Sequence, residues 1–224
     1  MQQHAPAATA SYPTVIPHPH RFCPGRGDLA ATTMLLLHDA GASDTSLEPF
    51  GAALAPGACL LSPRGTFRDG RGGACFFRRD QQGAPHGKDL VRSTERVVSL
   101  LRVATPAYGL TPGRVIAVGL AHGATLGASL LLRSAYALAG AVLWRPRRIG
   151  VPRGVPDLQG RPVFLSGAGG DAAATGVAGC AQLLTRAGAS VTLGPQNEGH
   201  FLSLVELADA RAWLLSTFPT LVSV

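Results

Sequence analysis

The stretch Arg114-Val115-Ile116-Ala117-Val118-Gly119-Leu120-Ala121-His122-Gly123-Ala124-Thr125 predicts a short apolar strand that ends in a sharp turn. The leucine-rich segment that follows, 126–133, predicts a helix. Gly119-x-Ala121-x-Gly123 has the spacing of G-x-S-x-G, a strained strand-to-helix turn that holds a nucleophile at the edge of a sheet. Both glycines are present, but alanine stands where that motif has serine. Every functional interpretation of the chain depends on this replacement.

Apolar runs of strand length alternate with segments whose apolar residues have helical spacing. The predicted elements are strands over 20–23, 32–37, 58–62, 114–120, 140–144, 162–167 and 190–193, and helices over 46–55, 89–104, 126–133, 172–187 and 202–217. Uninterrupted apolar runs are typical of parallel strands that are covered on both faces. The pattern therefore predicts an α/β fold, a mostly parallel doubly wound sheet with helices on both faces. Ser43, Asp44 and Thr45 are candidate N-caps of the helix over 46–55.

The composition predicts one compact domain. A chain of 224 residues with 46% hydrophobic and 15% charged residues fits one α/β domain with a substantial core. We expect that domain over 20–224, after a flexible N-terminal arm over 1–19 that is rich in Ala, Pro and His. The long glycine-rich loop over 66–88 has a length that is usually functional.

The net charge of +7 comes almost wholly from arginine, since Lys88 is the single lysine. The densest cluster, over 145–153, has no interleaved aromatics and no recognition-helix pattern, so we expect no nucleic-acid binding. A basic surface that attracts an anionic substrate fits the scattered arginines better.

The remaining patterns predict a protein without cofactor, metal or membrane span. Four cysteines are irregularly spaced and resemble buried free thiols of a reducing compartment: Cys23, Cys59, Cys75 and Cys180. No G-x-G-x-x-G or phosphate-binding loop is present. The N-terminus lacks the pattern of a signal peptide, and the apolar runs are shorter than the roughly 20 residues of a membrane helix. We therefore expect a cytoplasmic protein.

Candidate site residues follow the predicted strands at the end where open parallel sheets place their sites. They are His38 and Asp39, Ala121 and His122, Asp171, and His200. The chain order of elbow, Asp and His is that of a Ser-Asp-His triad. In that chemistry the histidine takes the proton of the nucleophile, and the aspartate holds the histidine in one tautomer. The backbone N–H groups of His122 and Ala40 are then candidates for an oxyanion hole.

The chain resembles the small phospholipase/carboxylesterase group of α/β-hydrolases, which includes acyl-protein thioesterases and hydroquinone-linked esterases. The resemblance runs from about residue 20 to the C-terminal helix. Its pieces are LLLHDAGASD (35–44), LLSPRG (60–65), FFRR (76–79), YGLTPGRVIAVGLAHGA (108–124), PVFLSGAGGD (162–171) and EGH (198–200).

This resemblance implies an α/β-hydrolase fold with a minimal cap and a catalytic site at position 121, with Asp171 as the acid and His200 as the base. It implies a small carboxylic ester, thioester or aromatic substrate. The residues expected to line the substrate pocket are His38, Asp39, Phe76, Phe77 and Arg78. A homodimer is frequent in that group, although no exposed apolar stripe in this sequence requires one.

Three features of the sequence depart from the pattern of the group. Alanine stands at 121 in place of serine, Asp39 stands in place of glycine, and Gly169-Gly170 stands in place of a charged pair. Without a hydroxyl at 121 there is no acyl-enzyme route, and loss of such a nucleophile lowers the rate by several orders of magnitude. Neither Cys59 nor Ser62 lies on the elbow, so neither replaces the serine.

Three interpretations follow from these departures. The chain is a serine esterase in which Ala121 is an engineered replacement of the nucleophile. Alternatively, the alanine is natural and the fold runs non-covalent acid/base chemistry, as in a lyase, a cyclase, an isomerase or a water-mediated hydrolase. In the third interpretation the chain is a non-catalytic protein that keeps the pocket as a ligand-binding site.

Overall fold

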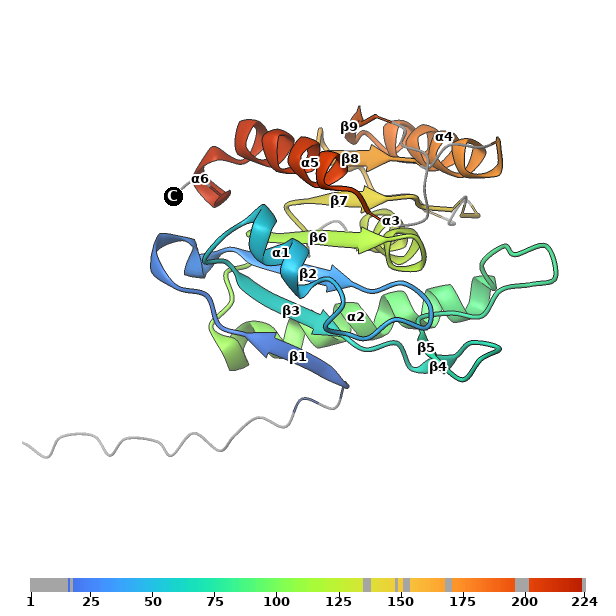
Figure 1. The fold of residues 1–224 in the computed structure, drawn as a ribbon, viewed down its shortest axis with the longest axis horizontal. Helices are drawn as coiled ribbons and strands as arrows, with labels where there is room; N and C mark the ends of the chain where they lie inside the picture. Colours follow the sequence, from blue (N-terminus) through green and yellow to red (C-terminus); the bar gives the residue numbers. More distant parts are fainter. Residues whose placement is uncertain are drawn as a thin grey trace, which may run out of the picture.

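A single seven-stranded sheet forms the centre of the molecule (Figure 1). The computed structural model describes residues 16, 18–134, 138–147, 149–150, 154–167, 171–195 and 202–222, apart from the side chains of 171–174 and 221–222. In spatial order the strands are β1 (His20–Cys23), β3 (Cys59–Pro63), β2 (Thr33–Leu37), β6 (Val115–Leu120), β7 (Gly140–Trp144), β8 (Pro162–Ser166) and β9 (Ser190–Leu193). Edge strand β1 is antiparallel to β3, and the other neighbours are parallel, so the predicted mostly parallel sheet is confirmed. Nearly all of the predicted arm, 1–19, lies outside the described residues.

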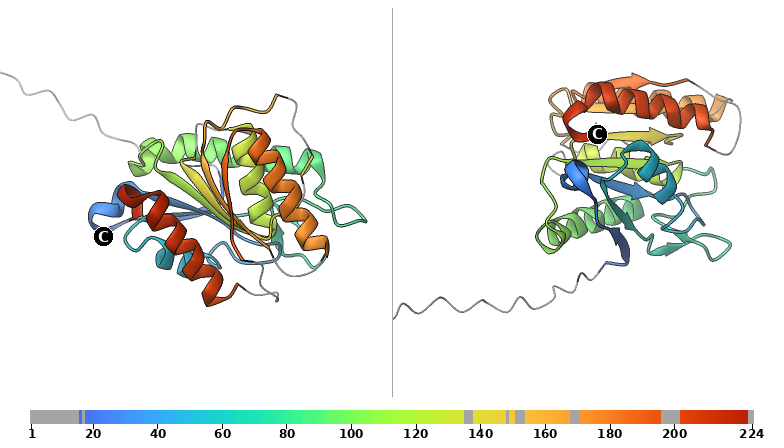
Figure 2. Two further views of the ribbon diagram at one scale, coloured as in Figure 1. Left: turned by 90° about the horizontal axis from the view of Figure 1, so that it is seen from above. Right: turned by 60° about the vertical axis from the view of Figure 1, so that its left-hand side comes forward.

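Helices cover both faces of the sheet, as predicted (Figure 2). One face carries α2 (Gly87–Tyr108), α3 (His122–Arg133) and α4 (Asp171–Arg186). The other face carries α1 (Glu48–Leu54) and α5 (Leu204–Thr217). Three short elements complete the described fold: the 3-10 helix η1 (Gly27–Ala31), the C-terminal helix α6 (Pro219–Val222), and a hairpin of β4 (Phe67–Arg68) and β5 (Ala74–Cys75).

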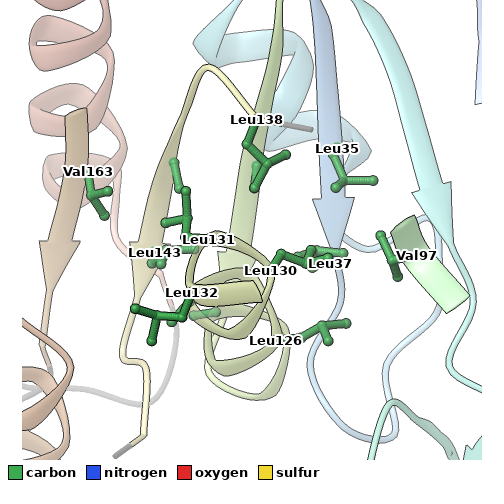
Figure 3. Packing of buried hydrophobic residues seen from close by; sticks show 14 of the residues in the cluster. Leu35, Leu37, Val97, Leu126, Leu130, Leu131, Leu132, Leu138, Leu143 and Val163 are labelled. Carbon is green, nitrogen blue, oxygen red and sulfur yellow. The ribbon is translucent and has the colours of Figure 1, made fainter. Parts of the chain in front are cut away.

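Two hydrophobic clusters, one on each face, hold the sheet between the helix layers. Leu35 and Leu37 of β2 belong to the cluster that packs beneath α3, whose leucines point at the sheet (Figure 3). Met34 and Leu36 of the same strand belong to the cluster on the opposite face. Because successive side chains of a strand point to opposite faces, a strand buried on both must be apolar throughout. This explains the uninterrupted apolar run over 34–37.

Several helix boundaries differ from the prediction, above all the caps of α1 and the end of α2. The predicted caps of α1 are wrong, because Leu47 is its N-cap and makes no side-chain cap bond, while a proline fills the first turn. Helix α2 runs beyond the predicted end at 104, through Pro106, and ends where Gly109 adopts a left-handed conformation (φ 65°). Proline removes one hydrogen bond but need not end a helix in its last turn.

Candidate active site

The carboxyl ends of the parallel strands meet at one edge of the sheet, where the β4–β5 hairpin also lies (Figure 1). An open pocket of about 710 Å³ adjoins this edge. Its walls are formed by Asp39, Ala40, Arg68, Asp69, Gly70, Arg71, Cys75, Phe77, Arg78, Arg79 and His122. The pocket therefore brings together the loop after β2, the start of α3 and the glycine-rich loop over 66–88.

The turn between β6 and α3 has the strained geometry of an elbow. Ala121 has φ 46° and ψ −96°, a conformation that L-residues rarely adopt. Its N–H donates to the Trp144 carbonyl (2.8 Å), and its carbonyl accepts bonds from the N–H (3.0 Å) and the Oγ1 hydroxyl (2.8 Å) of Thr125. The backbone on both sides of position 121 is thus fixed by hydrogen bonds to β7 and α3.

The two glycines of the elbow are required by close backbone contacts. A Cβ at Gly119 would lie 2.6 Å from the Ala124 nitrogen. A Cβ at Gly123 would lie 1.8 Å from the Leu37 carbonyl oxygen, at the end of β2. Glycine at both positions therefore lets α3 start against β2, which brings the N–H of residue 122 to the loop after that strand.

The carboxylate of Asp39 lies on the two amides that the sequence suggested as an oxyanion hole. Its Oδ1 accepts the N–H of Ala40 (2.7 Å) and the N–H of His122 (3.1 Å). The two donors converge on a single oxygen atom. The departure from glycine at position 39 thus places an anionic oxygen of the chain itself on these amides.

The His38 ring holds the loop after β2 in place through two hydrogen bonds to the backbone. Its buried Nε2 accepts the N–H of Gly65 (3.0 Å), so the proton is on Nδ1, which donates to the Asp39 carbonyl (2.7 Å). Burial lowers the pKa of His38, which keeps the ring neutral. The ring lies against Phe76, which is also buried. Neither His38 nor Phe76 is among the residues that line the pocket.

His122 lies on the wall of the pocket and is only 2% exposed. Its ring stacks on Phe77 with centroids 3.6 Å apart, and its Nε2 accepts the Phe77 N–H (3.2 Å). Burial, and then the nearby Arg79 guanidinium, lower the pKa of His122 to about 3. The imidazole is therefore neutral at ordinary pH.

Arg78 lines the pocket but is bound by an acidic residue of α2. Its Nε donates to Asp89 Oδ2 (2.7 Å) and its Nη2 to Asp89 Oδ1 (3.0 Å), while its backbone N–H donates to the same carboxylate (3.2 Å). The hydrogen bonds from Arg78 lower the pKa of Asp89 to about 2. This pair fastens the loop after β5 to the first turn of α2.

The structure describes the expected catalytic acid and base only in part. Asp171 is the first residue of α4, the next described element after β8, and its side chain lies outside the described residues. His200 also lies outside the described residues. The structure therefore leaves the Asp171–His200 pair a prediction.

The start of helix α5 carries a buried network of an ion pair and hydrogen bonds that the sequence analysis missed. Arg145, directly after β7, donates from Nη2 to both carboxylate oxygens of Glu206 (2.9 Å each), and the pair is almost fully buried. Glu206 also forms a capping box with Ser203 at the start of α5. The signal in the sequence was the spacing Ser203-x-x-Glu206, typical of a capping box.

Two absences concern only the part of the chain that the structure describes. No group of three or more His, Cys, Asp or Glu side chains within those residues could hold a metal ion. Among the described helices, none is long and apolar enough to cross a membrane. The four cysteines, all within the described ranges, are free thiols.

Comparison with known proteins gives consistent results. The Bacillus subtilis (strain 168) protein named "Putative hydrolase MhqD" is 36% identical over 185 residues, which cover 80% of this chain and 90% of that protein. The structure of the Bacillus cereus carboxylesterase superposes with a TM-score of 0.83 at 30% identity and covers 90% of this chain and 95% of its own. The Mesorhizobium loti carboxylesterase gives a TM-score of 0.81 at 25% identity, over 93% and 97% of the two chains. No model of a protein family matches the chain.

Proposed function

Because this chain belongs to the carboxylesterase and phospholipase type of α/β-hydrolases, we propose that its site is built to act on a small carboxylic ester or thioester. In this proposal the N–H groups of Ala40 and His122 form the oxyanion hole. Asp171 orients His200, which serves as the general base and acid. Position 121 is the place of the nucleophile, which this sequence fills with alanine.

One observation carries the proposal: the two amides converge on one oxygen beside the strained elbow. They lie 2.7 Å and 3.1 Å from Asp39 Oδ1. Donors preorganised in this way bind an oxygen that gains negative charge, as the carbonyl oxygen of an ester does when a nucleophile attacks. The same observation shows what an ester must overcome, because its carbonyl and the Asp39 carboxylate compete for the same donors.

The experiment restores the two residues of the group's pattern that this chain lacks, serine at position 121 and glycine at position 39. We expect Ala121→Ser alone to hydrolyse 4-nitrophenyl acetate slowly, because Asp39 still fills the hole. The double variant Ala121→Ser/Asp39→Gly should hydrolyse the ester about 100-fold faster than Ala121→Ser alone. This factor is on the order of the rate lost when one donor of an oxyanion hole is removed. Adding His200→Ala to the double variant should remove the gain. A double variant that is folded and no faster than the unmodified chain contradicts the proposal.

A second candidate function is favoured by the position of Asp39. An engineered replacement of serine accounts for Ala121 but leaves the carboxylate in the hole unexplained. If both residues are natural, Asp39 and His200 provide acid/base groups for a non-covalent reaction, such as lyase, cyclase, isomerase or water-mediated hydrolase chemistry.

A covalent probe separates the two functions. A fluorophosphonate should label the double variant at the serine introduced at position 121 and leave the unmodified chain unlabelled. Turnover of an ester or a related substrate by the unmodified chain, lost in both Asp39→Asn and His200→Ala, would support the non-covalent function. Ligand binding without turnover in any variant would instead support a non-catalytic protein.

A further inference from the structure

Two hydrogen-bond donors face each other on the wall of the pocket. A backbone N–H can only donate, so the bond from Phe77 makes Nε2 of His122 the acceptor and puts the ring proton on Nδ1. Nη2 of Arg79 lies 3.4 Å from that Nδ1. A guanidinium has no acceptor atom. The contact between Arg79 and His122 is therefore a pair of donors and not a hydrogen bond.

Neither donor has an acceptor among the described residues. The His122 side chain is almost fully buried, whereas Arg79 is exposed. Buried N–H groups are nearly always hydrogen-bonded, so the Nδ1–H of His122, on the wall of the pocket, calls for an acceptor. One anionic oxygen placed between His122 Nδ1 and the Arg79 guanidinium would satisfy both groups.

The other charges of the pocket favour an anion. The Arg78 guanidinium is bound by Asp89, whereas Arg68, Arg71 and Arg79 have no acidic partner within the described ranges. The two acidic groups on the wall are held by backbone amides. Asp69 Oδ1 accepts the N–H groups of residues 71 (2.9 Å) and 73 (2.7 Å), and Asp39 Oδ1 accepts those of residues 40 and 122.

We propose that this pocket selects esters that carry a free carboxylate, which the Arg79 guanidinium and the Nδ1–H of His122 bind together. The planar fork of an arginine matches the two oxygens of a carboxylate, and the imidazole adds one further donor. The inference rests on the proposed ester-acting function, because it names the class of ester. Arg79 is then a specificity-determining residue, and the aliphatic part of the substrate lies between it and the elbow.

The test compares two esters that differ in one methyl group. Monomethyl succinate carries a carboxylate, and dimethyl succinate does not. We expect calorimetric titration of the unmodified chain to show at least about tenfold tighter binding of the monoester, the size of a charge-assisted hydrogen bond. Arg79→Gln should abolish this preference and leave the diester unchanged. Arg102→Gln, which removes the same charge from an exposed position of α2, should retain it.

A second measurement reads the histidine without a variant. The ¹⁵N shifts of the His122 ring should show a neutral imidazole protonated at Nδ1, and that signal should move on addition of monomethyl succinate and not of dimethyl succinate. Equal binding of the two esters, or a preference that survives Arg79→Gln, would overturn the inference. These readouts are independent of hydrolysis. An Arg79-dependent preference in a chain whose double variant stays inactive would reject the proposed function alone.

Discussion

In the proposed function, the side chains at positions 39 and 121 face the same acyl group from two directions. The Asp39 carboxylate occupies the place of its oxygen, on the amides of residues 40 and 122. The methyl group at 121 replaces the hydroxyl that would attack its carbon. Because the alanine removes the nucleophile and the carboxylate competes for the oxyanion hole, restoring one position alone leaves the other obstacle in place. This is why the decisive variant carries both substitutions.

Gly123→Ala should be strongly destabilising. The added methyl group would lie 1.8 Å from the Leu37 carbonyl oxygen, a backbone atom of a central strand that cannot move aside. We expect a loss of about 3 kcal/mol or more in the free energy of unfolding, at the upper end of overpacking effects. Urea denaturation measures it. Gly87→Ala is the matched control, since nothing lies within 4 Å of the added atom, and an unchanged or slightly higher stability is expected there.

At the scale of residues, the sequence predicted those features of the site that the backbone conformation determines. The spacing of Gly119 and Gly123 identified the elbow, and the elbow placed the N–H of residue 122 toward the loop after β2. The side chain of Asp39 could not be predicted in the same way, because its position depends on two amides that only the fold brings together. The tautomer of His122 likewise depends on the N–H of Phe77, 45 residues away in sequence.

At the scale of elements, the ion pair of Arg78 and Asp89 joins the pocket loop to helix α2. The pattern of polar and glycine residues predicted a functional loop over 66–88, but not its internal order. That order comes from the β4–β5 hairpin and from contacts with the first turn of α2. Helix α2 begins two residues before its predicted start. Asp89 lies in its first turn, where a carboxylate also interacts well with the helix dipole.

The Asp89 pair should make stability depend on pH in a narrow acid range. The folded-state pKa of Asp89 is about 2, against 3.8 for an unperturbed aspartate, so the unfolded chain binds more protons between these values. The stabilisation is complete above pH 3.8 and is lost as the pH falls through about 2. We expect the urea midpoint of the unmodified chain to fall more steeply over this range than that of Asp89→Asn. Parallel curves for the two proteins would show that the pair does not contribute.

At the scale of the whole molecule, a buried ion pair connects the central sheet to one of the helix layers. The two-sided burial of the central strands follows from their uninterrupted apolar runs, which is why the fold class was predictable. The contact between the exit of β7 and the start of α5 was not, because Arg145 and Glu206 are 61 residues apart and each appears in the sequence as an ordinary charged residue. Their pairing depends on where α5 crosses the sheet.

Glu206→Ala should therefore destabilise the whole domain. The side chain is fully buried, receives two bonds from Arg145 and closes the capping box with Ser203. Removing one partner of a buried ion pair costs about 3–5 kcal/mol, because the remaining charge loses its compensation in a poorly solvated site. The exposed pair of Arg21 and Glu48 gives the matched control, and Glu48→Ala should cost about 1 kcal/mol or less. Urea denaturation of both variants measures the difference, and equal losses would mean that the buried pair contributes no more to stability than one on the surface.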